Sequence, residues 1–356
     1  MSAFETRRRF LKGAGALALA FGYPAMLRAA GDPFIADAHS HVGMFSSSKV
    51  SGRSLKAEMQ ASGVTLLSWS IPGDLRWITP TKYGIEQRST PTSGEQGKYF
   101  RGKLNSMRKQ LAKIELGFVQ KPSDIDAARS GVPHVVIAVE GAGFTEDGIE
   151  LLDQFYADGL RHVQLVHYIR NAIGDFQTER PEHGGITDFG VNVVKSCNRL
   201  GILVDLAHAT SPVIERVLDV STAPVIWSHS AITSTRSSWR QLPSLSRQLH
   251  IDDAKKIAQH GGAVGLWSLR NTVGSSPEGY ATELMRMVDM IGPEHVMFGT
   301  DLDGVGQFGV MDQLGDLRRV ADLLRKRGVD DRTLSAICFE NFARCLRAAM
   351  EARQAT

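Results

Sequence analysis

The sequence contains little cysteine. Only three cysteines occur among 356 residues, and none of them forms a Cys-x-x-Cys pair. Cys338 and Cys345 are seven residues apart in a segment with helical periodicity, which separates them by about two helical turns, too far for a disulfide. The lack of paired cysteines argues against a thiolate zinc cluster, and we expect Cys197, Cys338 and Cys345 to be plain buried thiols.

Long apolar runs and clustered charges are also scarce. The mildly apolar run Gly13–Tyr23 is shorter than the roughly 20 residues that a membrane-spanning helix needs. The formal net charge is only +3, and most of the excess lies in the first thirty residues. The rest of the chain therefore lacks the Lys- and Arg-rich stripe that nucleic-acid binding requires, and we expect no nucleic-acid partner. The composition, 42% hydrophobic and 22% charged, is that of a soluble globular protein.

The basic start of the chain has the pattern of an export signal. Residues 6–12 read TRRRFLK, and the weakly apolar run Gly13–Tyr23 follows. Paired arginines before such a run are typical of a bacterial twin-arginine signal peptide. We therefore expect residues 1–30 to be this signal, cleaved near Ala29 or Ala30, with the twin-arginine export machinery as a partner during secretion. The expected location is periplasmic or otherwise exported.

Eight short apolar segments predict the strands of one domain. They are rich in Val, Ile and Leu, as strands buried on both faces should be. The segments are Phe34–Val42, Thr65–Ile71, His134–Glu140, His162–His167, Ile202–His208, Pro224–His229, Ala263–Ser268 and His295–Asp301.

Helical patterns alternate with these strands. They cover residues 147–158, 189–200, 211–220, 282–291 and 311–327. This alternation indicates an α/β fold with a parallel (β/α)8 barrel, a TIM barrel, as a single domain over residues 31–356. The segment 73–120 fits the alternation least well. Its polar part 89–97 and basic helical part 103–113 predict a long loop and a helix at the catalytic face, which either shapes a substrate pocket or is simply solvated.

Polar residues occur at the C-terminal ends of six predicted strands. They are Asp37, His39 and His41 on the first strand, Glu140 on the third, His167 on the fourth, Asp205 and His208 on the fifth, His229 on the sixth, and Asp301 and Asp303 on the eighth. Barrel enzymes carry their active sites at this face, so we expect five histidines, a glutamate and an aspartate to converge there. A lone strand histidine is more often a hydrogen-bonded core or rim residue, and His134, His162, His260 and His295 are interpreted in this way.

This set of side chains suits a metal centre. His39 and His41 are two residues apart and point the same way from an extended strand. Imidazole and carboxylate ligands together fit zinc and similar divalent ions. A carboxylate such as Glu140, placed between histidines from opposite strands, can bridge two ions. Two ions in such a site polarise a carbonyl and hold a hydroxide at neutral pH.

Four stretches of the sequence resemble the membrane dipeptidase (renal dipeptidase) family of the amidohydrolase superfamily. They are VEG at residues 139–141, NRLGILVDLAH at 198–208, APVIWSHS at 223–230 and FGTDLDG at 298–304. The similarity covers nearly the whole chain after the signal, and a chance match of all four stretches in this order is implausible. The resemblance implies an amidohydrolase-type metal-dependent barrel that hydrolyses dipeptides, its small peptide substrates, by a metal-bound hydroxide.

The resemblance also implies individual roles at the metal centre. It implies two divalent ions, zinc in the family, with Glu140 bridging both ions. His39 would bind one ion, and His208 and His229 would complete the second. Asp301 would orient the attacking water and pass its proton to the leaving amine.

Two further residues are implied to bind the substrate. His167 is similar to a family histidine that contacts the substrate near the scissile carbonyl. Arg240, eleven residues after His229, matches the arginine that holds the substrate carboxylate, a task for which a guanidinium fork is suited. Dimers are common in the family, so a homodimer is implied as well.

The first strand departs from the family pattern. It carries His39-Ser40-His41 where the family usually has His-x-Asp. Other amidohydrolases use His-x-His at this place, so we expect His41 to bind metal, and Asp37 to be a structural residue. The departure leaves two alternatives open. One is another amidohydrolase reaction on the same site, with a lactone, an ester or another amide as substrate; the other is a non-catalytic periplasmic binding protein.

Overall fold

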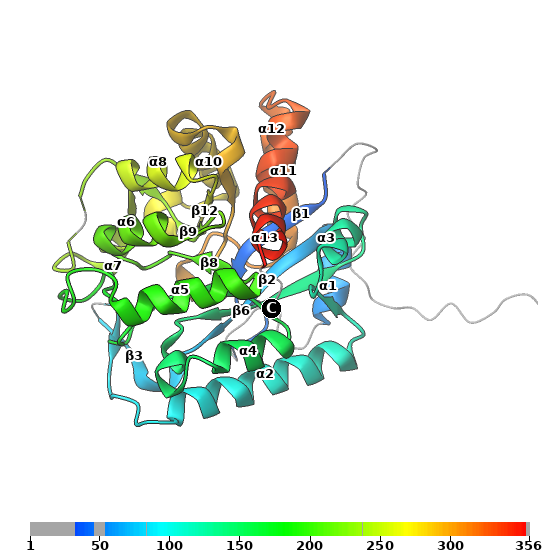
Figure 1. Cartoon of the computed structure of the whole chain (residues 1–356). Helices are drawn as coiled ribbons and strands as arrows, with labels where there is room; N and C mark the ends of the chain where they lie inside the picture. Colours follow the sequence, from blue (N-terminus) through cyan, green and yellow to red (C-terminus); the bar gives the residue numbers. More distant parts are fainter. Residues whose placement is uncertain (1–32, 46–53, 83, 237, 354–356) are drawn as a thin grey trace, which may run out of the picture.

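Eight parallel strands form the centre of the protein (Figure 1). The structure, a computed structural model, describes residues 33–45, 54–82, 84–236 and 238–353, so the expected signal at residues 1–30 lies outside the described residues. The strands are β1 Ile35–Ser40, β2 Val64–Pro72, β6 His134–Glu140, β7 Leu160–Gln164, β8 Leu203–Asp205, β9 Ile226–Ser230, β12 Ala263–Leu266 and β13 Val296–Phe298. They pair in this order, and all eight predicted strands are confirmed.

The sheet closes into a barrel where β13 meets β1. The amide of Asp301 donates to the carbonyl of His39 over 3.0 Å, and the amide of His41 donates to the carbonyl of Leu302 over 2.9 Å. These bonds continue the parallel pairing just beyond the end of β13, where Ser40 and Leu302 form a bridge. The first and last strands therefore place their C-terminal residues side by side, as a TIM barrel requires.

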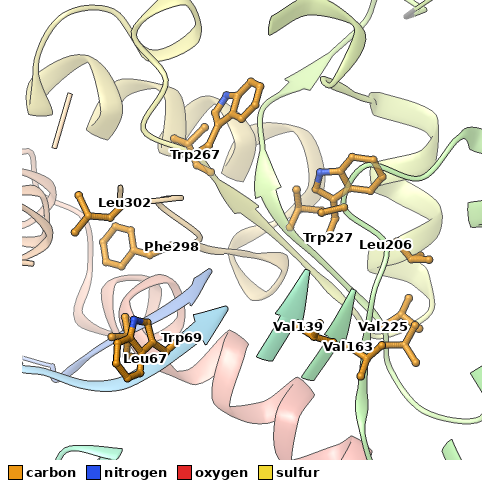
Figure 2. Packing of buried hydrophobic residues seen from close by; sticks show 14 of the residues in the cluster. Leu67, Trp69, Val139, Val163, Leu206, Val225, Trp227, Trp267, Phe298 and Leu302 are labelled. Atoms are coloured by element: carbon orange, nitrogen blue, oxygen red, sulfur yellow. The ribbon is translucent and has the colours of Figure 1, made fainter. Parts of the chain in front are cut away.

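Helices surround the barrel and complete the alternation. They are α1 Leu55–Ser62, α2 Glu95–Lys113, α3 Pro122–Arg129, α4 Leu151–Ala157, α5 Asp188–Leu200, α6 Ser211–Val220, α8 Ile251–Gln259, α10 Pro277–Ile291 and α11 Gly315–Lys326. Apolar side chains of strands and helices share one continuous core. Figure 2 shows part of it, with Val139 and Val163 on neighbouring strands and Trp227 and Phe298 further round the barrel.

The C-terminal helices cover the end of the barrel opposite the strand C-termini. α12 (Asp331–Ser335), a π-helical turn (Ala336–Glu340) and α13 (Asn341–Glu351) follow one another. Phe342 and Leu346 of α13 share a buried cluster with Leu66, Val136 and Leu203, which lie on the inner strands. The barrel is therefore filled at this end, and its open end is the one that carries the polar residues.

Segment 73–120 is more ordered than the sequence predicts. After the short turn η1 (Leu75–Trp77), β3 (Ile78–Thr81) and β4 (Gly84–Gln87) form an antiparallel hairpin. Helix α2 begins at Glu95, eight residues before the predicted start at Lys103, because Phe100, Leu104, Met107 and Leu111 form one buried stripe at helical spacing. The short strand β5 (Gly117–Phe118) then pairs with β6.

Short elements occupy the remaining connections. They are η2 Gly143–Asp147, β10 Ile232–Thr233, α7 Pro243–Ser246, β11 Leu249–His250, α9 Arg270–Val273, η3 Pro293–His295 and η4 Gly306–Phe308. Among the described residues, no helix is long and apolar enough to cross a membrane.

Candidate metal centre and active site

Glu140 lies at the centre of the polar cluster at the open end of the barrel. It ends β6, is 3% exposed, and its two carboxylate oxygens face different histidines. Oε2 lies 3.3 Å from Nε2 of His41, whereas Oε1 lies 3.2 Å from His167, 3.3 Å from His208, 3.6 Å from His39 and 3.7 Å from His229, each measured to Nε2. A single carboxylate therefore joins two groups of histidines.

His39 and His41 come from β1 and the residue that follows it. Both side chains are buried, and their Nε2 atoms are 3.2 Å apart. Nδ1 of His41 donates to the backbone carbonyl of Ser70 over 2.7 Å, which turns Nε2 toward the cluster. The same Nε2 lies 3.5 Å from Oδ1 of Asp301. One group of donors is therefore His39, His41 and Asp301.

His208 and His229 form the opposite group. Their Nε2 atoms are 3.2 Å apart, and both side chains are buried. Nδ1 of His229 pairs with the hydroxyl of Ser228 at 2.9 Å, whereas Nδ1 of His208 has no hydrogen-bond partner among the described residues. With Glu140, these histidines complete the second side of the cluster.

The backbone adopts unusual conformations at the strand ends that carry the site. His208 has φ 72°, Asp301 has φ 53° and Asp303 has φ 68°. Such positive values cost a non-glycine residue free energy and persist only where the surroundings impose them. At Gly304, a Cβ atom would clash with Oδ1 of Asp301 and crowd the ring of His41, so only glycine fits there. Backbone strain and close packing together fix the directions of these ligand side chains.

Burial sets the protonation of the histidines. It lowers the pKa of His39, His208 and His229 well below the ordinary value, although Glu140 opposes this effect at all three rings. These three rings are therefore neutral and offer lone pairs. Burial also opposes charge on His41, but Glu140 and Asp301 outweigh it and raise its pKa to about 9. The positively charged form of His41 is therefore favoured between the carboxylates of Glu140 and Asp301.

The two carboxyl groups differ in pKa. For Glu140 burial is outweighed by His167, His39 and the other histidines, which hold its pKa well below the ordinary value. Burial raises the pKa of Asp301 to about 7, although His41 partly opposes this. Near neutral pH, Glu140 is a permanent carboxylate while Asp301 can gain and lose a proton.

The donor set fits divalent metal ions. Three overlapping groups hold ligand atoms within 4.8 Å of one another, namely His39–Glu140–His229, His39–His41–Asp301 and Glu140–His167–His208. All members are buried, and neutral imidazoles with carboxylates are ligands that zinc and related ions prefer. The anionic carboxylate of Glu140 between two histidine groups is suited to bridge two ions.

A cavity of about 520 Å³ opens directly above the cluster. His41, Glu140, His167, Arg247 and Asp301 line its floor, and mostly apolar side chains form its walls. This volume is within the range of small-molecule sites, and such a combination of apolar walls and a few convergent polar groups is typical of them.

The sequence model of the membrane dipeptidase family, peptidase family M19, matches residues 90–356. The chain belongs to the membrane dipeptidase family. Its relatives include dipeptidase verJ of Clonostachys rogersoniana, which is 32% identical over 65% of this chain and 59% of its own length. Dipeptidase 3 of Mus musculus is 28% identical over 62% of this chain and 45% of its own length. The match therefore spans about half the length of these curated relatives.

Solved structures of metallopeptidases show the same barrel. The dipeptidase AC superimposes with a TM-score of 0.74 over 90% of this chain and 99% of its own, at 20% identity. A metallopeptidase from Rhodobacter sphaeroides, bound to a phosphinate mimic of L-Ala-D-Ala, gives a TM-score of 0.72 over 89% of this chain and 100% of its own, also at 20% identity. At these identities the likeness shows the fold.

In this member of the membrane dipeptidase family, most of the predicted site residues lie together. His39, His41, Glu140, His167, His208, His229 and Asp301 all belong to the buried cluster. Arg240 does not. Its side chain is exposed, and its guanidinium lies 5.1 Å from the ring centre of Trp239. The family resemblance and its spacing from His229 placed it at the site, but in this structure the connection between β9 and α8 carries it outside the cavity.

Arg247 occupies the place that the sequence assigned to Arg240. It is 7% exposed, its Nη2 lies 2.6 Å from Nε2 of His229, and its Nη1 donates to the hydroxyl of Tyr168 over 3.0 Å. Of the arginines and lysines that the structure describes, it alone lines the cavity. No local motif marks Arg247, because its position depends on the course of a surface connection.

Asp74 is a second residue that the sequence did not reveal. It follows β2 by two residues, and its Oδ1 accepts a hydrogen bond from Nδ1 of His167 over 2.7 Å. Its Oδ2 accepts from the amide of Tyr168 over 3.0 Å. The sequence signal that could have revealed Asp74 is its position just after a predicted barrel strand.

Other polar residues support the cluster from below. Asp37 accepts hydrogen bonds from the amide and hydroxyl of Thr300, which ties β1 to the residues after β13. His162 lies inside the barrel, with Nδ1 2.7 Å from the hydroxyl of Ser68 and Nε2 3.1 Å from Oδ2 of Asp205. His162 is therefore a hydrogen-bonded core residue, as predicted.

Proposed function

We propose that this chain hydrolyses dipeptides with the help of two divalent metal ions, zinc being the expected metal. One observation carries the proposal. The carboxylate of Glu140 joins two histidine groups beneath a cavity in which, among the described residues, Arg247 supplies the one guanidinium. A two-ion site beside a carboxylate anchor suits a small peptide with a free C-terminus. The phosphinate mimic of L-Ala-D-Ala bound to the related metallopeptidase supports this substrate class.

The metal ligands follow from the two donor groups. His39 and His41 would hold one ion, His208 and His229 the other, and Glu140 both. Bound there, divalent ions would supply Lewis acidity toward the substrate carbonyl and the attacking water. The neutral rings of His39, His208 and His229 are already in the protonation state that metal binding requires.

His167 would stabilise the negative charge that develops on the carbonyl oxygen. Burial disfavours its charged form, but Asp74 and Glu140 outweigh burial and raise its pKa. An imidazolium whose Nδ1 donates to Asp74 also carries a proton on Nε2, which faces Glu140 in this structure and would be shared with an oxyanion at the cavity floor.

Asp301 would move the proton between water and the leaving amine. Its carboxyl lies at the cavity floor, and burial raises its pKa to about 7. A group with this pKa accepts a proton and releases it again at neutral pH, which is what general base and general acid steps require.

Arg247 would hold the substrate carboxylate. Its guanidinium is buried at the cavity floor, stacks 5.0 Å from the ring centre of Trp267, and is fixed by the hydroxyl of Tyr168. A preordered fork of donors binds a carboxylate in one orientation and so sets the register of the peptide bond over the ligands.

A substrate panel tests this function. Purified protein loaded with zinc is given dipeptides, N-blocked dipeptides, dipeptide amides, lactones and esters. Turnover of free dipeptides above all others supports the proposal. Turnover of lactones or esters alone would assign another amidohydrolase reaction, and a metal-loaded protein inert toward the whole panel would be a binding protein.

Export is a separate proposal, and it rests on the sequence TRRRFLK at residues 6–12. We propose that the chain leaves the cytoplasm by the twin-arginine route. Replacement of Arg7 and Arg8 by Lys should retain the protein in the cytoplasm. Unchanged export of this variant would refute the assignment.

A further inference from the structure

The walls of the cavity are far more apolar than its floor. Above the polar cluster, one wall is formed by the turn and hairpin after β2, with Leu75, Ile78, Pro80 and Ile85. No charged side chain lines this wall in the part of the chain that the structure describes. Leu75 remains 39% exposed, so apolar surface is open to whatever enters the cavity.

The wall formed by the β3–β4 hairpin, called the hairpin wall, lies next to Arg247, the residue proposed to hold the substrate carboxylate. Ile78 shares a buried cluster with Tyr168, and Ile85 packs against that cluster. The hydroxyl of Tyr168 accepts a hydrogen bond from Arg247 over 3.0 Å. Tyr168 is therefore the link between the guanidinium and the hairpin wall.

This adjacency identifies which substrate residue meets the wall. In a dipeptide the free carboxylate is attached to the Cα of the C-terminal residue. When Arg247 holds that carboxylate, the same Cα carries its side chain beside Tyr168 and the hairpin. A polar or charged side chain would lose hydration there without finding a partner, whereas an apolar side chain would gain by burial.

We infer that the preferred substrates are dipeptides with a large apolar C-terminal residue, and that the β3–β4 hairpin with Leu75 forms the pocket for that side chain. This inference rests on the proposed dipeptidase function and adds a specificity pocket to it. A hydrophobic pocket discriminates by roughly 10- to 200-fold for each methylene gained or lost.

The test compares kcat/KM for Ala-Leu and Ala-Phe with that for Ala-Ala, Ala-Asp and Ala-Lys, each with L and D C-terminal residues. We expect the apolar pair to exceed Ala-Ala by about tenfold or more in the preferred stereochemistry, and the charged pair to be poorer still. Leu-Ala is included because it carries the same atoms with the large side chain on the other residue. A preference for Leu-Ala over Ala-Leu would overturn the assignment.

A pair of variants connects the preference to the wall. Ile85→Ala should lower the ratio of kcat/KM for Ala-Leu to that for Ala-Ala by about tenfold. Leu218→Ala on the outer helix α6 removes a similar apolar side chain far from the cavity and should leave the ratio unchanged. An unchanged ratio in Ile85→Ala would refute the pocket. If no dipeptide is hydrolysed at all, the proposed function fails; if Ala-Ala is hydrolysed at least as well as Ala-Leu, only this inference fails.

Discussion

Asp74 and His167 are 93 residues apart in the sequence, yet their side chains meet over 2.7 Å at the open end of the barrel. Asp74 follows β2 and His167 follows β7, so two non-neighbouring strands of the barrel meet at this contact. Asp74 also binds the amide of Tyr168, which fixes the carboxylate on two sides. The ring of His167 is therefore held in one orientation, with Nε2 directed at Glu140.

The first prediction concerns this contact. Asp74→Asn removes the charge that orients and protonates His167, so kcat should fall by about 10- to 100-fold, as for other groups that position a catalytic histidine. The alkaline side of the pH profile, where His167 loses its proton, should move to lower pH than in the unaltered protein, because the pKa of His167 is no longer raised by Asp74. The metal content should be retained. Unaltered kcat with an unaltered pH profile would show that Asp74 is only structural.

The second prediction separates the two arginines. Arg247→Ala should raise KM for free dipeptides by about 10- to 100-fold, because a charged hydrogen-bonded anchor contributes roughly 1.5–3 kcal/mol. Arg240→Ala should leave KM unchanged, because this exposed side chain lies over Trp239 outside the cavity. Dipeptide amides, which lack the carboxylate, should respond far less to Arg247→Ala. If KM rose for Arg240→Ala and not for Arg247→Ala, Arg240 would be the residue that holds the substrate carboxylate.

The third prediction concerns Gly304. A Cβ atom at this position clashes with Asp301 and crowds His41, so Gly304→Ala should weaken metal binding and lower activity. Gly102 on the surface of α2 is the matched control, because a Cβ there meets nothing within 4 Å. Gly102→Ala should keep full activity and raise stability by about 0.5–1 kcal/mol. Metal titrations and thermal unfolding measure both effects, and wild-type metal affinity in Gly304→Ala would contradict the reasoning.

The fourth prediction concerns the thiols. Burial raises the pKa of Cys197 to about 12 and that of Cys345 to about 11, and Cys338 is buried as well. A thiol reacts as its thiolate, so none of the three should react with a thiol reagent in the native protein at pH 8 or 9. Unfolding should make all three thiols accessible to the reagent. A rapidly reacting thiol in the native state would show that the described core opens locally.

The sequence was sufficient for the fold and for most of the cluster. Strands such as His134–Glu140 are short, continuous apolar runs, and a barrel places all strand ends on one face. Glu140, His167 and His229 could therefore be assigned to one site before their distances were known. The three cysteines are buried thiols, in agreement with the expectation.

The residues that the sequence missed depend on surface connections. Arg247 and Arg240 lie in the same connection between β9 and α8, and nothing in their neighbours reveals which of them turns inward. The β3–β4 hairpin lies in segment 73–120, which the sequence predicted as a long loop and a helix; Pro80 and Gly84 interrupt its strand pattern but suit an edge hairpin. Tertiary contacts with Tyr168 and the cavity, rather than local conformational preference, determine the structure of these two connections.

The central claim is a two-ion centre that hydrolyses dipeptides, and metal analysis beside activity tests it most directly. Metal content is measured by plasma emission on the purified protein and on His208→Ala, with hydrolysis of Ala-Leu and Ala-Ala followed on the same samples. The account predicts about two zinc ions per chain with dipeptide turnover, and in His208→Ala the loss of turnover with the loss of one or both ions. A protein that binds no metal, or that hydrolyses dipeptides equally well after His208→Ala, would contradict it.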